Sequence, residues 1–356
     1  MRKVLIPTKL DKAAGKMLLD KGYEVIQDAE TPLDVLVDMH QDAEAMIVRS
    51  EKITSDVIDK LPKLRLIVRA GAGYNTIDTK YARRKGVDVM NTPGANANAV
   101  AEEVFAMAFA AYRFVVPGDV STRAGKWEKK KFLGRELTGK TIGIVGLGNI
   151  GQLVARHASG FDMTILAYDP VVSASKADEV GAKLVDMQTI FAESDIITLH
   201  IPENDETRGI INASLLKLVK PGTMLINCAR SGIVNEDDIR SLKVEKQLLF
   251  CNDVYASDAE GEKSVADIAD VMLPHLGANT KEANFVAACR SSEQLIAYFE
   301  QGITRYVVNK EVPDGLDANY QKLAHNLAKV ARAIIGKNAS ISSVKCFFYG
   351  ALTPFA

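Results

Sequence analysis

A glycine-rich turn between a strand pattern and a helix pattern limits the possible folds of this chain more than any other feature. The run Gly146-Leu147-Gly148-Asn149-Ile150-Gly151 follows the apolar segment Thr141–Val145 and opens a helical pattern that ends near Ser159. Gly146 permits a tight turn, Gly148 lets another group approach the backbone, and Gly151 allows close packing of helix on strand. Strand, glycine turn and helix in this order are typical of a dinucleotide-binding βαβ unit.

An acidic residue after the next predicted strand indicates which dinucleotide fits. Asp169 follows the apolar run Thr164–Tyr168. A carboxylate at this position accepts hydrogen bonds from ribose hydroxyls and repels a 2′-phosphate, so NAD is favoured over NADP. The alternative interpretation of Asp169 is a turn residue before Pro170. The strand, turn and helix around it favour the cofactor role.

Short apolar runs alternate with helical patterns along most of the chain, which is typical of parallel sheets covered on both faces. The strand series restarts after a long helical stretch at about Asn98–Tyr112. We therefore expect an α/β protein with two doubly wound parallel-sheet domains. The predicted strands are Val4–Ile6, Ala45–Val48, Leu64–Val68, Val87–Met90, Thr141–Val145, Thr164–Tyr168, Ile196–His200, Met224–Asn227, Leu248–Asp253 and Val271–Leu273.

The restart of the strand series also predicts how the domains follow one another. Residues 1–96 and 281–308 are expected to form a flavodoxin-like substrate domain, with a Rossmann cofactor domain of residues 97–280 inserted into it. Residues 309–356 are expected to form a C-terminal extension or the start of a further domain, with a helix at Asn319–Gly336 and a strand at Ser343–Tyr349. The Asn98–Tyr112 helix is apolar on all sides, which favours burial between domains or between subunits.

Composition excludes several classes of protein. With 44 basic and 45 acidic residues, the chain lacks the strong positive charge of a nucleic-acid-binding protein. No stretch of ~20 apolar residues predicts a membrane span. Four cysteines without a CxxC pair predict neither a metal site nor a disulfide scaffold. We expect a cytoplasmic protein with free thiols.

Three predicted strands end in polar residues whose side chains suit the oxidation of a 2-hydroxy acid. Arg230 follows one strand, Asp253 to Asp258 follow the next, and His275 follows the last. In open α/β sheets ligands bind at the carboxyl ends of the strands, so these side chains should converge. Imidazole exchanges protons near neutral pH, guanidinium matches a carboxylate, and an acid beside imidazole stabilises its charged form.

With these residues in these positions, the chain resembles the D-isomer-specific 2-hydroxyacid dehydrogenases over about residues 1–308. The resemblance is carried by short segments spread over both predicted domains. They are Val48–Ser50, Arg69–Gly73, Asn91–Asn96, Gly125–Phe132, the Gly146 motif, Asn227–Gly232 and Pro274–Ala278.

The resemblance implies a role for individual residues. Arg230 would bind the substrate carboxylate, His275 would be the acid/base, and Asp258, five residues past Asp253, would pair with it. The expected NAD-binding residues are Gly146, Gly148, Asn149, Ile150, Gly151, Asp169, Cys228, Ala229, Asp253, Gly277 and Ala278. The expected substrate-binding residues are Arg49, Arg69, Gly71, Ala72, Gly73 and, for a phosphate, Lys129.

Two departures from the family pattern affect these expectations. The family places a Glu, usually followed by Pro, where this chain has Asp258-Ala259, so Glu260 or Glu262 is an alternative partner for His275. Ala72 and Ile201 stand where close relatives carry hydroxyl residues near the nicotinamide, which would weaken the affinity for NAD.

The resemblance implies a homodimer or homotetramer that acts on a small molecule, a phosphorylated three-carbon 2-hydroxy acid. The cluster of cations suits such a multiply charged substrate. One alternative is a glyoxylate or hydroxypyruvate reductase of the same family. An alternative of another class is an NAD-sensing binding protein, similar to the corepressors that share this fold.

Overall fold

The computed structural model describes residues 1–310, 326, 327 and 330. The chain divides into two compact units. Unit 1 comprises Met1–Pro93 and the described residues from Phe285 onward, and unit 2 comprises Gly94–Asn284. Unit 2 is therefore an insertion in unit 1, and the expected boundaries at residues 96/97 and 280/281 lie a few residues from those observed. The helix and strand predicted within residues 319–349 fall almost entirely outside the described part.

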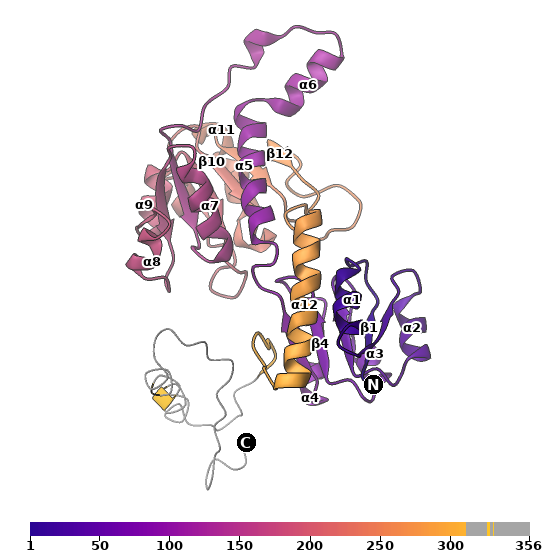
Figure 1. The fold of residues 1–356 in the computed structure, drawn as a ribbon. Coiled ribbons are helices and arrows are strands. Elements are labelled where there is room, and N and C mark those ends of the chain that lie inside the picture. The colour runs from indigo at the N-terminus through magenta and orange to yellow at the C-terminus, as the bar shows by residue number, and fades with distance from the viewer. Residues whose placement is uncertain (311–325, 328–329, 331–356) are drawn as a thin grey trace. The chain divides into compact units, whose positions relative to one another are not determined.

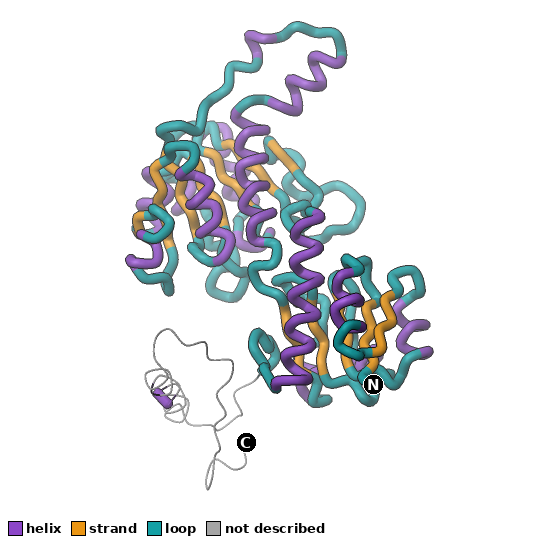
Figure 2. The backbone as a smooth tube through the Cα atoms, viewed as in Figure 1, coloured by secondary structure: helices purple, strands orange, loops and turns teal. Residues whose placement is uncertain are grey.

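Unit 1 is built on a sheet of five parallel strands (Figures 1 and 2). The strands are β1 (Lys3–Ile6), β2 (Glu24–Gln27), β3 (Ala45–Val48), β4 (Leu66–Arg69) and β5 (Asp88–Asn91). Their order is β2-β1-β3-β4-β5, and every pair is parallel. This is the doubly wound order of flavodoxin-like sheets, as predicted.

Five helices pack on this sheet. They are α1 (Ala13–Leu19), α2 (Leu33–Met39), α3 (Ser55–Asp59), α4 (Thr79–Arg84) and α12 (Lys281–Gln301), most of which lies in unit 1. The Ser292 hydroxyl in α12 donates to the Ala14 carbonyl at 3.0 Å. Beyond α12, the Val308 N–H donates to the Val89 carbonyl at 2.8 Å. The segment that follows α12 therefore bonds to the edge strand β5, which was made near the start of the chain.

Unit 2 contains a second parallel sheet, of seven strands. The strands are β6 (Thr141–Val145), β7 (Thr164–Tyr168), β8 (Lys183–Leu184), β9 (Ile196–Leu199), β10 (Met224–Asn227), β11 (Leu249–Asn252) and β12 (Val271–Met272). Their order is β12-β11-β10-β9-β6-β7-β8. The strand order reverses beside β6, so the glycine turn after β6 lies at the switch point where such sheets bind ligands.

Helices cover both faces of this sheet. The helices of unit 2 are α5 (Ala97–Tyr112), α6 (Val115–Arg123), α7 (Asn149–Ser159), α8 (Ala174–Asp178), α9 (Met187–Glu193), α10 (Ala213–Leu216) and α11 (Glu236–Lys246), with 3-10 turns η1 (Lys129–Lys131) and η2 (Ser231–Ile233). In Figure 1, α5 and α7 run side by side on one face. Helices α9, α10 and α11 contribute to the apolar core on the other face.

The structure corrects the interpretation of α5 as a helix that is apolar all round. Its buried residues, among them Val100, Val104 and Met107, pack in the core of unit 2, while Glu102 on the opposite side is exposed. Burial within unit 2 itself therefore explains its apolar residues. The segment that follows α5 carries several exposed apolar side chains, which are Val115, Val116, Val120, Trp127 and Leu133.

None of the helices in the described part of the chain is both long and apolar enough to cross a membrane. Cys228, Cys251 and Cys289 are free thiols, whereas Cys346 lies outside the described residues.

Candidate active site

The turn between β6 and α7 has the backbone shape that its glycines allow. Gly146 has a φ of 98°, in the left-handed region, and a Cβ here would lie 2.7 Å from the carbonyl oxygen of His200. A Cβ on Gly151 would collide with the carbonyl oxygen of Gly146. A Cβ on Gly148 would meet no described atom within 4 Å. The turn therefore has no space for a side chain at Gly146 or Gly151, whereas the space beside Gly148 is open.

Asp169, at the end of β7, holds this turn from the neighbouring strand. Its Oδ2 accepts the N–H of Leu147 at 2.8 Å, and its Oδ1 accepts those of Val171 and Val172 at 2.9 and 3.0 Å. Because a carboxylate oxygen offers two lone pairs, Oδ2 can accept one further hydrogen bond. Asp169 therefore stabilises the turn and keeps an acceptor position for a further hydrogen bond.

The first turn of α7 offers donors for an anion. Gly148 and Asn149 are exposed there, Ile150 is half-buried, and no side chain of the described residues caps this helix end. The first N–H groups of a helix have no partner within it, and the positive end of the helix dipole adds to their attraction for phosphate. Together with the open space at Gly148, these donors fit the pyrophosphate of a dinucleotide.

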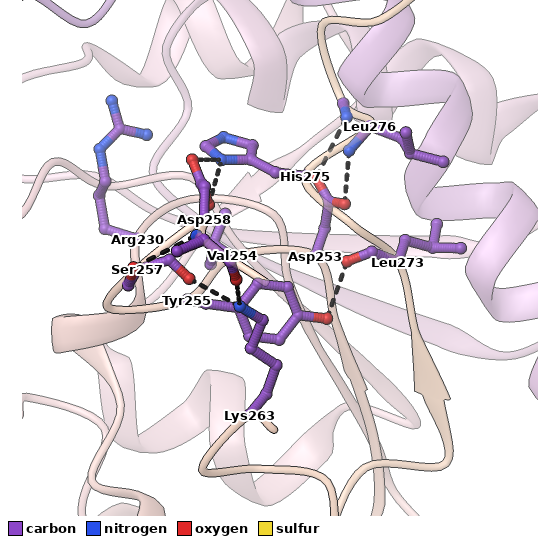
Figure 3. Close-up of polar contacts among 12 residues, drawn as sticks. Arg230, Asp253, Val254, Tyr255, Ser257, Asp258, Lys263, Leu273, His275 and Leu276 are labelled. Atoms are coloured by element: carbon purple, nitrogen blue, oxygen red, sulfur yellow. Dashed lines mark hydrogen bonds and ion pairs between the residues drawn. The ribbon is translucent and has the colours of Figure 1, made fainter. Parts of the chain in front are cut away.

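His275 and Asp258 come together at the carboxyl end of the same sheet. The two carboxylate oxygens of Asp258 lie 3.0 and 3.2 Å from Nδ1 of His275 (Figure 3). Of the three acids considered from the sequence, Asp258, Glu260 and Glu262, the structure places Asp258 against the imidazole. The shorter side chain of Asp, compared with the Glu of the family pattern, therefore reaches its partner.

The Arg230 backbone is fixed by the end of β10. The amide of Asn227 donates to the Arg230 carbonyl at 3.0 Å and accepts the Ala229 N–H at 3.1 Å. The guanidinium donates to the Ala229 carbonyl at 2.6 Å. In Figure 3 it extends on the same side of the loops as the His275 ring. A cation and a proton-exchanging group therefore share this edge of unit 2.

Asp253 shapes the turn that carries His275. It is 1% exposed, and its two oxygens accept the N–H groups of Leu276 and Gly277 at 2.7 and 3.1 Å. His275 itself has a φ of 56°, which is rare for a residue other than glycine. The buried carboxylate thus holds the backbone on the C-terminal side of a strained residue.

Two residues that the sequence analysis missed support the loop of Asp258. The ammonium group of Lys263 donates to the carbonyls of Ser257, at 3.0 Å, and Ala259. The Tyr255 hydroxyl donates to the Leu273 carbonyl at 2.8 Å, which ties the loop to the strand before His275. A lysine and a tyrosine in a loop carry no sequence signal for such contacts, because their partners are backbone carbonyls.

Other predicted cofactor residues lie at the same strand ends. Ala229 is buried after β10, and Gly277 and Ala278 follow His275. The thiol of Cys228 packs in the core, 3.7 Å from the sulfur of Met107, and burial raises the pKa of this thiol well above its ordinary value. Cys228 is therefore a neutral core residue.

Arg49 and Arg69, in unit 1, stand at the carboxyl ends of β3 and β4. The guanidinium Nε of Arg69 donates to the Arg49 carbonyl at 3.1 Å. Burial lowers the pKa of Arg49 from its ordinary value. Gly71 has a φ of 149°, and a Cβ there would collide with the Arg69 guanidinium. The glycine therefore lets the arginine side chain lie against the backbone of the loop.

The remaining predicted substrate residues are placed differently. Ala72 and Gly73 are half-buried, and the Ala72 carbonyl accepts the side-chain amide of Asn91 at 2.6 Å. Lys129 lies in η1 of unit 2, in an open cavity of about 420 Å³ that Trp127, Glu128 and the two following lysines also line. The structure thus brings Arg49, Arg69 and Gly71 together within unit 1.

Comparison with known proteins gives a family for this site. Residues 105–277 match the model of the D-isomer specific 2-hydroxyacid dehydrogenase NAD binding domain. A D-3-phosphoglycerate dehydrogenase of Synechocystis is 37% identical over 345 residues, which are 94% of this chain and 62% of that protein. The protein of the same name from Methanocaldococcus jannaschii is 34% identical over 99% of this chain and 68% of its own length.

A solved structure is similar over nearly its whole length. NAD+-bound 3-phosphoglycerate dehydrogenase of Entamoeba histolytica superposes with a TM-score of 0.71 at 31% identity, covering 87% of this chain and 99% of that one. This chain spans less than two thirds of the Synechocystis relative, so part of that longer protein has no counterpart in it.

Proposed function

The chain belongs to the D-isomer-specific 2-hydroxyacid dehydrogenase family, and on that premise we propose that it oxidises 3-phosphoglycerate at C2 with NAD. The proposal for the substrate is supported by the relatives named D-3-phosphoglycerate dehydrogenase, which match over most of the chain. The observation that carries the chemistry is the contact of Asp258 with Nδ1 of His275.

His275 is the proposed acid/base. With Nδ1 facing Asp258, the opposite ring nitrogen, Nε2, is the one that takes the proton of the substrate hydroxyl. The neighbouring carboxylate stabilises the imidazolium that forms and fixes which nitrogen carries the first proton. NAD, when bound, supplies the acceptor for the hydride that leaves C2.

Three arginines are the proposed anchors of the substrate. A guanidinium matches a carboxylate with two parallel hydrogen bonds, which suits Arg230 for the C1 carboxylate beside the reacting carbon. Arg49 and Arg69 in unit 1 are the proposed contacts for the rest of the substrate, with Gly71, Ala72 and Gly73 offering backbone groups. Lys129 is the proposed additional contact for the phosphate.

The proposed cofactor residues are those of the sequence analysis, with Cys228 contributing only backbone. The pyrophosphate would lie over Gly148 at the N-terminus of α7, with Asn149 and Ile150 beside it. Asp169 would accept a ribose hydroxyl through the remaining lone pair of its Oδ2. The turn at Gly277 and Ala278 would border the nicotinamide.

We also propose that the chain acts as a homodimer or homotetramer in the cytoplasm. The support for an oligomer is the exposed apolar surface of residues 115–133. Trp127 and Leu133 there are 87% and 88% exposed, and apolar side chains gathered in an exposed patch are typical of protein–protein interfaces. Light scattering of the purified chain would give the number of subunits, and a monomer would contradict the proposal.

Steady-state turnover on a panel of acids tests the proposed reaction. 3-Phosphoglycerate with NAD, and 3-phosphohydroxypyruvate with NADH, are expected to give the highest kcat/KM in each direction. Hydroxypyruvate, glyoxylate and the NADP pair complete the panel. Faster reduction of the two unphosphorylated acids would identify a glyoxylate or hydroxypyruvate reductase. Binding of NADH without turnover of any acid would identify an NAD-sensing binding protein.

A further inference from the structure

A glutamate on α5 lies against the carboxylate that shapes the catalytic turn. Oε2 of Glu103 is shielded from solvent and has no hydrogen-bond donor among the described residues. A Cβ on Gly277 would lie 2.9 Å from this oxygen and 3.4 Å from Oδ2 of Asp253. The two carboxyl groups therefore lie beside the same glycine, where two negative charges would repel each other.

The surroundings of the two acids decide which one holds a proton. Burial, and next the Asp253 carboxylate, raise the pKa of Glu103 to about 8. Burial also raises the pKa of Asp253, but the N–H groups of Leu276 and Gly277 act against this by stabilising its charge. Asp253 therefore carries the negative charge at neutral pH, and Glu103 carries the proton.

The charge on Asp253 acts on the backbone next to His275. Leu276 and Gly277 follow His275 directly, and both donate their N–H groups to Asp253. A left-handed φ is unfavourable for a residue with a side chain. Hydrogen bonds to an ionised group are stronger than those between neutral groups, so the two bonds to Asp253 can offset this cost. The conformation of His275 thus depends on Asp253 staying ionised and in place.

We propose that Glu103 is a positioning residue whose protonated carboxyl donates a hydrogen bond to Asp253 and thereby fixes the turn that carries His275. The inference rests on the proposed function only where it treats His275 as the acid/base. The proton on Glu103 is a property of the protein without cofactor or substrate, and it can be observed there.

Ionisation of Glu103 should change turnover in a direction that can be tested. The other titratable groups around the pair are the Cys228 thiol, Tyr255 and His275. The thiol stays neutral, burial and the nearby Asp253 raise the pKa of the Tyr255 hydroxyl, and the positive form of His275 favours the charge on Asp253. As the pH rises through about 8, Glu103 loses its proton and a second negative charge appears beside Asp253. The turn then loosens, and turnover falls on the alkaline side.

Two substitutions separate the proton from the shape of the side chain. Glu103→Gln keeps the size and a donor for Asp253 but cannot ionise, so its turnover at neutral pH should stay within about threefold of the unmodified chain. Glu103→Leu keeps the volume without the donor, and kcat should fall about tenfold to a hundredfold. Glu102→Gln is the matched control, because Glu102 is exposed on the same helix and accepts a hydrogen bond from the side-chain amide of Asn98.

The first measurement is the infrared carbonyl band of a protonated carboxylic acid in the free protein. We expect a band that disappears as the pH passes about 8, and that is missing from Glu103→Gln but present in Glu102→Gln. The second is the pH profile of kcat, in which the alkaline decline centred near that pH should be absent from Glu103→Gln. Equilibrium binding of NADH over the same pH range shows whether the affinity for the cofactor also changes when the turn loosens.

The outcomes are distinct for this inference and for the proposed function. Absence of the band, equal losses in Glu103→Gln and Glu103→Leu, or an unchanged alkaline decline in Glu103→Gln would overturn the role of Glu103. Turnover of a different hydroxy acid would overturn only the proposed substrate, and the variants would then be compared on that acid. With no turnover at all, the infrared band still decides where the proton lies.

Discussion

The two turns that make up the site of unit 2 are held by different kinds of interaction. The turn after β6 is shaped by the main chain, because Gly146 takes a left-handed φ and Gly151 packs against the Gly146 carbonyl. The turn after β12 is shaped by side chains. Asp253 holds its backbone, and Asp258 holds the ring of His275.

The two turns should therefore be disrupted by different kinds of change. A main-chain turn depends on steric space, so a methyl group added where that space is filled, as at Gly146 or Gly151, disrupts it at any pH. A turn held by carboxylates depends on which of them carry protons, so it responds to pH and to the removal of single charges. Three predictions test this comparison, in addition to those above.

The largest effect is expected for His275→Asn. Asparagine tolerates a left-handed φ, so the backbone of the turn should be kept while the acid/base is lost. Loss of a general base reduces kcat by about 10²–10⁴-fold. NADH affinity, measured by fluorescence titration, should change little, because the imidazole is exposed and contacts Asp258. Near-normal turnover would show that another group moves the proton.

Gly151→Ala is expected to destabilise unit 2. The added Cβ would collide with the Gly146 carbonyl oxygen and lie 3.1 Å from Cγ2 of Ile144, and overpacking of this kind costs about 1–3 kcal/mol. Thermal unfolding and NADH titration measure the effect.

Gly148→Ala is the matched control for that substitution. Gly148 has a φ of −75°, and its Cβ would meet no described atom within 4 Å, so the melting temperature should be unchanged. NADH affinity should still fall, because the methyl group occupies the open space proposed for the pyrophosphate. Equal loss of stability in both variants would contradict the steric explanation.

The smallest effect is expected for Lys263→Met. The substitution removes the hydrogen bonds to the carbonyls of Ser257 and Ala259 but keeps a long side chain over Tyr255. Net hydrogen-bond energies of about 0.5–1.5 kcal/mol correspond to a decrease of roughly twofold to tenfold in kcat if the loop of Asp258 loosens. Lys16→Met, which removes an exposed ion pair with Asp20 in unit 1, is the control and should leave kcat unchanged.

The sequence predicted the parts of the fold that repeat a pattern. Buried strands such as β3 and β10 appear as unbroken apolar runs, and the fold class with its inserted domain follows from their spacing. Strand β2 was missed because its four residues are all half-buried at the edge of the sheet. Strand β8 was missed because it has only two residues, also at an edge.

The candidate site was predictable to the extent that it follows strand ends. Arg230, Asp253 and His275 are candidates because each follows a strand, and the contact of Asp258 with His275 was expected from the family resemblance. The role of Glu103 could not be predicted, because it depends on the packing of α5 against β10 and β11. These segments are far apart in the sequence. The support from Lys263 could not be predicted either, since backbone carbonyls as partners leave no trace in the pattern.

The return of the chain from unit 2 to unit 1 has a consequence for synthesis on the ribosome. The first sheet is translated within 93 residues, yet α12 and the segment that bonds to Val89 emerge only after all of unit 2. Domains tend to fold as units during synthesis, starting from the N-terminus. Unit 2 is contiguous in sequence, so it can fold before α12 has been translated. Until then the sheet of unit 1 lacks α12, and the edge of β5 is open to another newly made chain.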